Sequence, residues 1–182
     1  MNWIRISATL ALLGVAQLTR AQECPDIPDN TGTLNQLLSE LRAAPNEMQG
    51  RNLNNQIWAI WATAPDAIAQ DLLDKGRERI RVADYAKAIE QFTKLTAYCP
   101  HYAEGWNQRG FAHYLRQDYG AALDDIAEAL QRNPRHYGAL VGRATVLISM
   151  GRTEVGHTEL RNALKLNPWL SERFLLPVGE DL

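Results

Sequence analysis

Residues 103–134, AEGWNQRGFAHYLRQDYGAALDDIAEALQRNP, contain two amphipathic segments separated by a central turn. In the second segment, apolar residues recur at the three- and four-residue spacing of a helix. Asp118 lies at the position of an N-cap, and Pro134 lacks the N–H that would continue the second helix. The stretch therefore predicts a helical hairpin with helices at 103–116 and 119–131.

The same pattern recurs at a fixed period on both sides of this hairpin. Pro100, Pro134 and Pro168 are 34 residues apart, and a period of this length is typical of a solenoid built from repeats. Further hairpins are expected at 69–82 with 85–97 and at 137–150 with 153–165, where Thr153 takes the N-cap position. Residue pairs that coincide at this period are Gly76 and Gly110, Asp84 and Asp118, Tyr85 and Tyr119, Ala88 and Ala122, Arg109 and Arg143, and Ala129 and Ala163.

Small residues are expected where the two helices of a hairpin meet, because a larger side chain there would push them apart. The first helices carry Gly76, Gly110 and Ala144 at this position, and the second helices carry Ala88, Ala122 and Gly156.

This pattern resembles the tetratricopeptide repeat (TPR), whose 34-residue signature runs Trp, Leu, Gly, Tyr, Ala, Phe, Ala, Pro. The middle unit matches it through Trp106, Gly110, Ala122, Ala129 and Pro134, with Ile126 in the phenylalanine position. The resemblance implies an all-α solenoid with repeats at 69–102, 103–136 and 137–168.

Two flanking segments complete the predicted solenoid. Residues 33–66 form a degenerate N-terminal hairpin, in which Trp58 takes the position that Phe92 has in the next unit. Terminal units of solenoids are usually atypical, so this hairpin is expected to cap the first repeat. Residues 169–182 are expected to cover the opposite end with a short capping helix and a tail.

The N-terminus resembles a secretory signal peptide at residues 1–21. A short charged start is followed by the apolar run Ile6–Leu18, and cleavage is expected after Ala21, with Ala16 as the alternative. Residues 22–32 would form an N-terminal extension of the mature chain. Resemblance to small exported TPR proteins implies a secreted or periplasmic location in a Gram-negative bacterium.

The net charge of the mature chain argues against two classes of partner, nucleic acids and anionic lipid surfaces. Loss of Arg5 and Arg20 with the signal leaves 17 basic and 21 acidic residues, a formal charge of -4. Nucleic acids need a clustered basic face, and anionic lipids need a polybasic segment. No further apolar run of about 20 residues follows the signal, so no membrane insertion is expected after cleavage.

The two cysteines, Cys24 and Cys99, allow a single intramolecular disulfide in an oxidising compartment. Such a bond would stabilise the fold by about 4 kcal/mol in the chain-entropy model and would hold the N-terminal extension against the repeats. The alternative is a pair of free thiols.

The resemblance also implies a concave groove, lined by the first helices of the repeats, that binds a protein or peptide partner. Its expected residues combine aromatic anchors with polar side chains that can hold a peptide. They are Arg77, Arg81, Tyr102, Glu104, Asn107, Phe111, Tyr114 and Thr145. For Phe111 and Tyr114 the alternative is packing against neighbouring helices.

No catalytic, cofactor or metal site is expected. His101 and His136 follow prolines in linkers, where exposure is expected, and no two histidines have the spacing of a helical zinc site. Asp124 and Asp125 point about 100° apart on a helix, and a solvated face explains them. A clamp for a C-terminal carboxylate is not expected either, because only Arg77 among the matching positions is a suitable cation.

Protein binding without catalysis is therefore the predicted function. The alternative is a structural subunit of an envelope assembly, for which the tryptophans would form an exposed aromatic patch. Gel filtration distinguishes the two, because an obligate subunit with a large bare apolar face should self-associate or precipitate.

Overall fold

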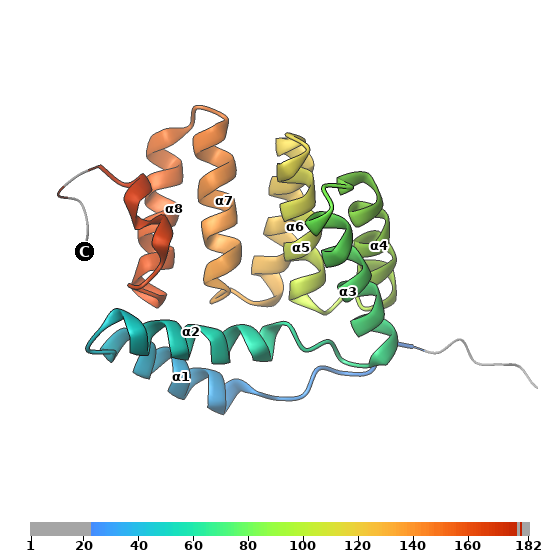
Figure 1. Cartoon of the computed structure of the whole chain (residues 1–182), viewed down its shortest axis with the longest axis horizontal. Coiled ribbons are helices and arrows are strands. Elements are labelled where there is room, and N and C mark those ends of the chain that lie inside the picture. The colour runs from blue at the N-terminus through green and yellow to red at the C-terminus, as the bar shows by residue number, and fades with distance from the viewer. Residues whose placement is uncertain (1–22, 178, 180–182) are drawn as a thin grey trace, which may run out of the picture.

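The computed structural model describes residues 23–177 and 179, and the predicted signal peptide lies outside them. The described chain is all-α, as expected (Figure 1). Its elements in order are α1 (Thr31–Ala43), α2 (Glu47–Trp61), α3 (Ala67–Arg81), α4 (Tyr85–Tyr98), α5 (Ala103–Leu115), α6 (Tyr119–Arg132), α7 (Tyr137–Ser149), α8 (Thr153–Leu166) and the short 3₁₀ helix η1 (Ser171–Leu175).

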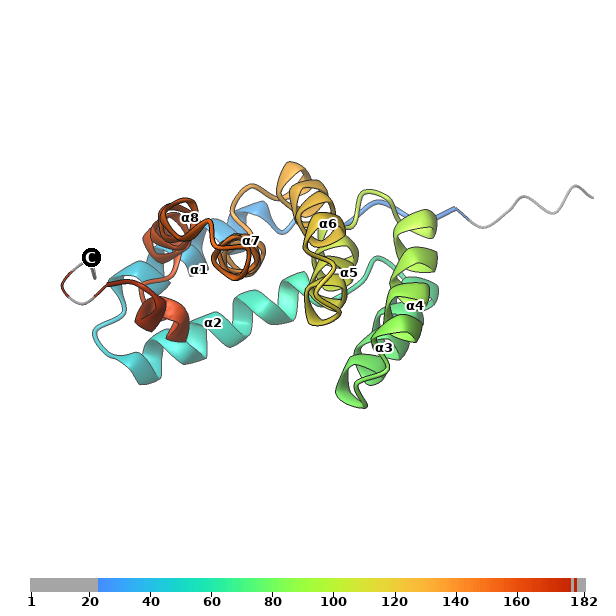
Figure 2. The same cartoon turned by 90° about the horizontal axis from the view of Figure 1, so that it is seen from above.

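Helices α3 to α8 form three successive antiparallel hairpins whose ends lie within two residues of the expected positions. Seen from above, α5 and α7 lie nearer to α2 than α6 and α8 do (Figure 2). The first helices of the last two repeats therefore face the N-terminal hairpin.

Glycine and alanine allow close contact inside each hairpin. A Cβ atom added at Gly76 would overlap the ring of Phe92, and one added at Gly156 would lie 2.6 Å from Ile148 Cγ1. At Gly110 it would lie 3.2 Å from the backbone oxygen of Ala122. These glycines are required by helix packing.

The turn of each hairpin has a residue in the left-handed conformation at the same position of the repeat. Ala83, Gln117 and Gly151 have φ of 58°, 62° and 77° at positions one repeat apart. In each turn the next N–H donates to a carbonyl five residues earlier, as Asp84 does to Arg79 at 2.8 Å. This is the Schellman motif, in which a left-handed residue ends a helix.

The N-cap expected at Thr153 is wrong. Helix α8 has Arg152 as its N-cap, and no side-chain hydrogen bond forms there. The position equivalent to Asp84 is Arg152, because the turn has the same length in each repeat. Asp84 caps α4 by accepting from the backbone N–H of Lys87, whereas Asp118 makes no such bond in α6.

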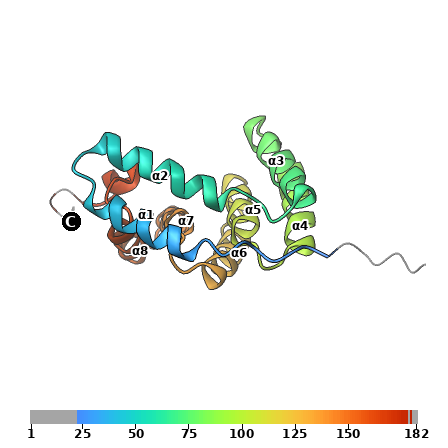
Figure 3. The same ribbon diagram turned by 90° about the horizontal axis from the view of Figure 1, so that it is seen from below.

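The N-terminal hairpin forms but does not extend the stack beyond the first repeat. Helices α1 and α2 lie crosswise beneath the ends of α5 to α8 (Figures 1 and 3). Their buried apolar residues share one core with the second and third repeats, whereas α3 and α4 have a separate core. The members that α1 and α2 contribute to the shared core are Leu37, Leu38, Leu41, Ile57 and Trp61.

The N-terminal extension runs beneath the repeats from the side of α4 to the start of α1 (Figure 3). There Cys24 is joined to Cys99 by a disulfide, with their Cα atoms 5.2 Å apart. Cys99 is fully buried at the C-terminal end of α4. His101 lies beside the bond and contacts the carbonyl oxygen of Pro25 at 2.9 Å. The disulfide therefore ties the irregular segment before α1 to the first repeat.

None of the helices in the described part of the chain combines the length and the apolar character that crossing a membrane requires.

The three equivalent turns give a matched test of backbone strain. A non-glycine residue in the left-handed region costs about 1 to 2 kcal/mol, partly offset by its lower entropy in the unfolded chain. Ala83→Gly and Gln117→Gly should each raise the free energy of unfolding by about 0.5 to 1 kcal/mol in urea titrations. Gly151→Ala should lower it by a similar amount. A loss of stability in Ala83→Gly or Gln117→Gly would show that the left-handed conformation is not strained at that position.

Candidate functional site

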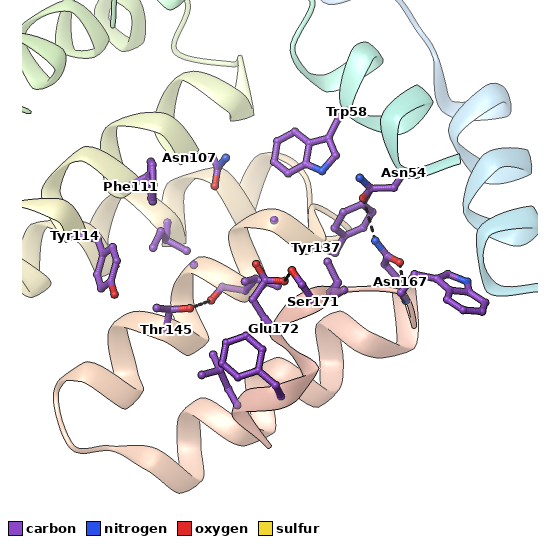
Figure 4. A pocket seen from close by; sticks show the side chains of 18 of the residues that line it. Asn54, Trp58, Asn107, Phe111, Tyr114, Tyr137, Thr145, Asn167, Ser171 and Glu172 are labelled. Carbon is purple, nitrogen blue, oxygen red and sulfur yellow. Dashed lines mark hydrogen bonds between the residues drawn. The ribbon is translucent and has the colours of Figure 1, made fainter. Parts of the chain in front are cut away.

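A cleft of about 900 Å³ lies between α2, α5, α7 and the C-terminal segment (Figure 4). Its lining is mainly apolar and aromatic, with amide side chains interspersed. The residues that form it are Glu47, Arg51, Asn54, Asn55 and Trp58 of α2; Asn107, Gln108, Phe111 and Tyr114 of α5; Ile126; Tyr137, Gly138, Val141, Gly142, Thr145 and Val146 of α7; and Asn167, Trp169, Leu170, Ser171, Glu172, Phe174 and Leu175.

The α5 wall carries the aromatic anchors. Phe111 is 44% exposed, and its ring stacks with that of Tyr114 at 6.5 Å between centroids. Figure 4 shows Asn107, Phe111 and Tyr114 along the same side of the cleft. They come together because their spacing of four and three residues places them on one face of the helix.

The α7 wall is shallow because two glycines face the cleft one turn apart. At Gly138 an added Cβ would lie 2.6 Å from the ring of Trp58, so the indole of α2 rests directly on the α7 backbone. At Gly142 an added Cβ would meet only Ile126, at an ordinary 3.4 Å. Packing therefore requires glycine at the first position and leaves the second open to the cleft.

The C-terminal segment closes the cleft on another side. Trp169 lies against Gly50 of α2, where an added Cβ would lie 2.5 Å from its Cδ1 atom, and its indole N–H donates to the Leu41 carbonyl at 3.1 Å. Asn54 accepts hydrogen bonds from the Tyr137 hydroxyl at 2.8 Å and from the Asn167 amide at 3.0 Å. These contacts hold α2, α7 and the residues after α8 in fixed positions relative to one another.

The charged groups of the cleft have local partners. Arg51 pairs with Glu47 at 3.1 Å at the exposed start of α2. The carboxylate of Glu172 accepts from the Ser171 hydroxyl at 3.2 Å. The cleft thus presents apolar surface and amides, with no concentrated charge of either sign among its lining residues.

Beneath the cleft lies a buried carboxylate, Glu104, which is 1% exposed. Its Oε1 atom accepts from Arg77 at 2.9 Å and from Gln108 at 2.7 Å. Its Oε2 atom accepts from Asn107 at 2.9 Å and contacts His136 Nε2 at 3.1 Å. Burial favours the neutral acid, but the hydrogen bonds from His136 and Gln108 and the charge of Arg77 outweigh it. The pKa of this carboxyl therefore lies below its ordinary value.

The structure corrects the expectation that His136 is exposed. His136 is fully buried, and its ring stacks on that of Trp61 at 4.1 Å. Its Nδ1 atom accepts the backbone N–H of Ala139, so Nε2 carries the proton that points to Glu104. The histidine therefore caps α7 and connects it to both α2 and α5.

The expected solvated face at Asp125 is also wrong. Asp125 is 5% exposed and forms two hydrogen bonds to Arg109, at 2.6 and 2.8 Å. One repeat later, Arg143 pairs with Glu159 at 2.6 Å. The Asp125 carboxylate is therefore part of an ion pair that joins α5 and α6, the two helices of its repeat.

Four of the eight expected groove residues line the cleft, and four do not. Asn107, Phe111, Tyr114 and Thr145 are among its lining residues. Glu104 and Tyr102 are buried, and Tyr102 donates from its hydroxyl to the Trp61 carbonyl at 2.8 Å.

The two arginines have partners within the chain. Arg77 is bound to Glu104, and Arg81 is paired with Glu78 at 2.6 Å on the exposed side of α3.

Sequence reasoning missed the contributions of α2 and of residues 167–175 to the cleft. The glycines at 50 and 138 were a signal that bulky groups approach the backbone there, but the sequence does not say which groups. Among the described residues, no group of histidine, cysteine, aspartate and glutamate side chains is arranged to hold a metal ion.

This architecture of stacked helical hairpins is that of a solenoid repeat protein. Residues 103–136 match the sequence model of the tetratricopeptide repeat family. The middle repeat is therefore similar to a tetratricopeptide repeat, and the fold of the described chain is that of a TPR solenoid.

Curated proteins that share sequence with the chain include one from a bacterium and one from a fungus. A TPR repeat-containing protein of Rhizobium etli is 29% identical over 142 residues, which cover 78% of this chain and 64% of that protein. Protein bimA of Emericella nidulans is 33% identical over 85 residues, 47% of this chain and 10% of its own. The chain thus spans less than two thirds of either relative.

Solved structures share the fold. The Arabidopsis OM64 TPR domain matches with a TM-score of 0.56 and 20% identity, over 59% of this chain and 93% of that domain. The TPR2B domain of yeast Sti1 in its pHsp70 complex matches with a TM-score of 0.56 and 21% identity, over 60% of this chain and 91% of its own.

Removing the charge of Glu104 should destabilise the protein in a pH-dependent way. A buried ionic group that loses its partner typically costs about 3 to 5 kcal/mol, and Glu104→Gln leaves Arg77 and its other donors facing an amide. Because the pKa of Glu104 is lowered on folding, its contribution is present above the unfolded-state pKa of about 4.3 and is lost as pH falls through the folded-state value. Urea titrations should show the difference from the native protein shrinking on acidification. A difference that is independent of pH would contradict this assignment.

The two glycines of α7 should respond in opposite directions to alanine. Gly138→Ala forces Trp58 to shift and should lower the free energy of unfolding by about 1 to 3 kcal/mol. Gly142→Ala meets no close contact and should raise it by up to about 1 kcal/mol, because alanine favours helix. The two variants can be compared by urea denaturation. Equal losses at both positions would show that Gly142 is also needed for packing.

Proposed function

We propose that this protein is a non-catalytic adaptor that binds a segment of another polypeptide in the cleft. The supporting observation is the half-exposed Phe111, which stacks on Tyr114 in the wall of an apolar cleft of about 900 Å³. Exposed aromatic side chains within a concave, mainly apolar surface are typical of sites that anchor a ligand.

The likeness to TPR domains supports a polypeptide as the ligand. The yeast Sti1 domains of this fold were solved in complexes named for pHsp70 and pHSP90. Amide side chains such as those of Asn107 and Gln108 can hydrogen-bond a peptide backbone, and the aromatic rings can hold its side chains.

We further propose that the adaptor works in an oxidising compartment outside the cytoplasm, most simply the periplasm of a Gram-negative bacterium. The Cys24–Cys99 disulfide supports this location, because such bonds persist where thiols are not kept reduced. The signal-like sequence of residues 1–21 supports it too.

Affinity capture from an envelope extract of the host tests the proposed binding. The bait is the purified protein with its disulfide intact, beside the variant Phe111→Ala/Tyr114→Ala. A matched control is Met150→Ala/Val155→Ala, which removes apolar side chains of 43% and 45% exposure outside the cleft.

The native protein and the control should retain one partner that the cleft variant loses. The partner's affinity for each purified variant should then be measured by calorimetry, with helicity and melting recorded in parallel. Capture that is unaffected in a folded cleft variant would rule out the cleft as the binding site. Unfolding of that variant alone would show that the two aromatics are needed for packing.

A further inference from the structure

Glu172 is a carboxylate of the cleft that has no cationic partner within the described part of the chain. It belongs to η1, and Figure 4 shows its side chain beside Ser171 and facing the cleft. Its Oε2 atom accepts from the Ser171 hydroxyl, which is neutral, at 3.2 Å. The other charged residues of the lining, Glu47 and Arg51, pair with each other. The lining therefore carries one uncompensated negative charge.

Several polar side chains of the lining already use their hydrogen-bond donors within the chain. The amide nitrogens of Asn107 and Gln108 donate to Glu104 at 2.9 and 2.7 Å. The Thr145 hydroxyl donates to the Val141 carbonyl at 2.9 Å. What these side chains can still offer a ligand is their acceptor oxygens. An ammonium group, which has three N–H donors and no acceptor, complements such a surface.

Aromatic side chains form much of the remaining lining. They are Trp58, Phe111, Tyr114, Tyr137, Trp169 and Phe174. The face of an aromatic ring attracts a cation, and the attraction is stronger where water is excluded. Methylene groups of a long cationic side chain also pack on apolar surface while its charged end keeps a polar partner. The cleft therefore suits a cation that is carried on an aliphatic chain.

The single uncompensated charge distinguishes between kinds of cation. Arginine pairs best with a carboxylate through both of its oxygens, but Ser171 already donates to one oxygen of Glu172. A free diamine would bring a second ammonium group, and the other carboxylate of the lining, Glu47, is already paired with Arg51. Lysine brings one ammonium group on a four-carbon chain. No lysine of this chain is among the lining residues, so such a group has to come from another molecule.

We propose that the cleft holds a lysine side chain of the partner protein. The ammonium group donates to Oε1 of Glu172, and the methylene groups lie against the aromatic lining. This assignment rests on the proposed function and names the chemical group that the cleft recognises.

The probe is Nα-acetyl-lysine methylamide, titrated into the native protein with its disulfide intact and followed by nuclear magnetic resonance. It should shift the resonances of lining residues such as Thr145 and Gly142. Its form acetylated at the side-chain nitrogen has no charge and should bind about 10-fold more weakly, as expected when hydrogen bonds to a charged group are lost. The matching arginine derivative and the diamine cadaverine should also bind more weakly.

The decisive variant is Glu172→Gln, which keeps the shape of the side chain and removes its charge. Its matched control is Glu154→Gln, at an exposed carboxylate of α8 outside the cleft. Both variants should melt close to the native protein, because neither carboxylate forms an ion pair within the described residues. Binding of the lysine derivative should fall about 10-fold in Glu172→Gln and remain unchanged in Glu154→Gln. If Glu172→Gln disturbs the fold, the comparison of ligands on the native protein still decides.

Four results would overturn the inference. They are no shift of cleft resonances with the lysine derivative, equal binding of its acetylated form, tighter binding of the arginine derivative or of cadaverine, and unchanged binding to folded Glu172→Gln. None of these contradicts the proposed function, which depends on whether the captured partner is lost with Phe111→Ala/Tyr114→Ala. If that partner remains bound to the folded double variant, the proposed function fails on its own evidence.

Discussion

The buried carboxylate of Glu104 imposes the constraint on which the cleft depends. An ionised group removed from water must receive hydrogen bonds from within the protein, and here the donors come from α3, from α5 itself and from the N-cap of α7. The first helices of all three repeats are thereby fixed relative to one another. Two of these helices are walls of the cleft.

His136 extends this constraint to the N-terminal hairpin. The same imidazole that faces Glu104 caps α7 and stacks on Trp61 at the end of α2. Tyr102, one repeat earlier, bonds to the Trp61 carbonyl. Equivalent positions of neighbouring linkers thus hold α2 in place. A buried polar network therefore stabilises a relative placement of helices that apolar packing alone would leave less specific.

The repeat architecture could be predicted because its signals are local. The 34-residue period, the closing prolines and the spacing of apolar residues specify each hairpin and the face that it buries. The placement of α1 and α2 could not be predicted, because an amphipathic pattern indicates that a face is buried and does not identify its partner. Trp61 and Leu41 fit either a stack on α3 or the observed position across the later repeats.

The candidate site could be predicted only as far as the repeat register specifies it. Phe111, Tyr114, Asn107 and Thr145 follow from the repeat register, because that register places them on the inner faces of α5 and α7. Glu104 and Tyr102 share that register but are buried, because His136 contacts Glu104 and the Trp61 carbonyl accepts from Tyr102. The register gives the direction of a side chain and does not show what lies over it.

The crosswise N-terminal hairpin also affects the order in which this chain can fold. Repeats that contact only their neighbours can form in sequence as they are synthesised. Here Asn35 pairs with Arg135, and the Leu41 carbonyl accepts from Trp169, across separations of 100 and 128 residues. The first helices to be made therefore complete their contacts only after the last repeat exists. Such long-range closure raises contact order and slows folding relative to an open solenoid of the same length.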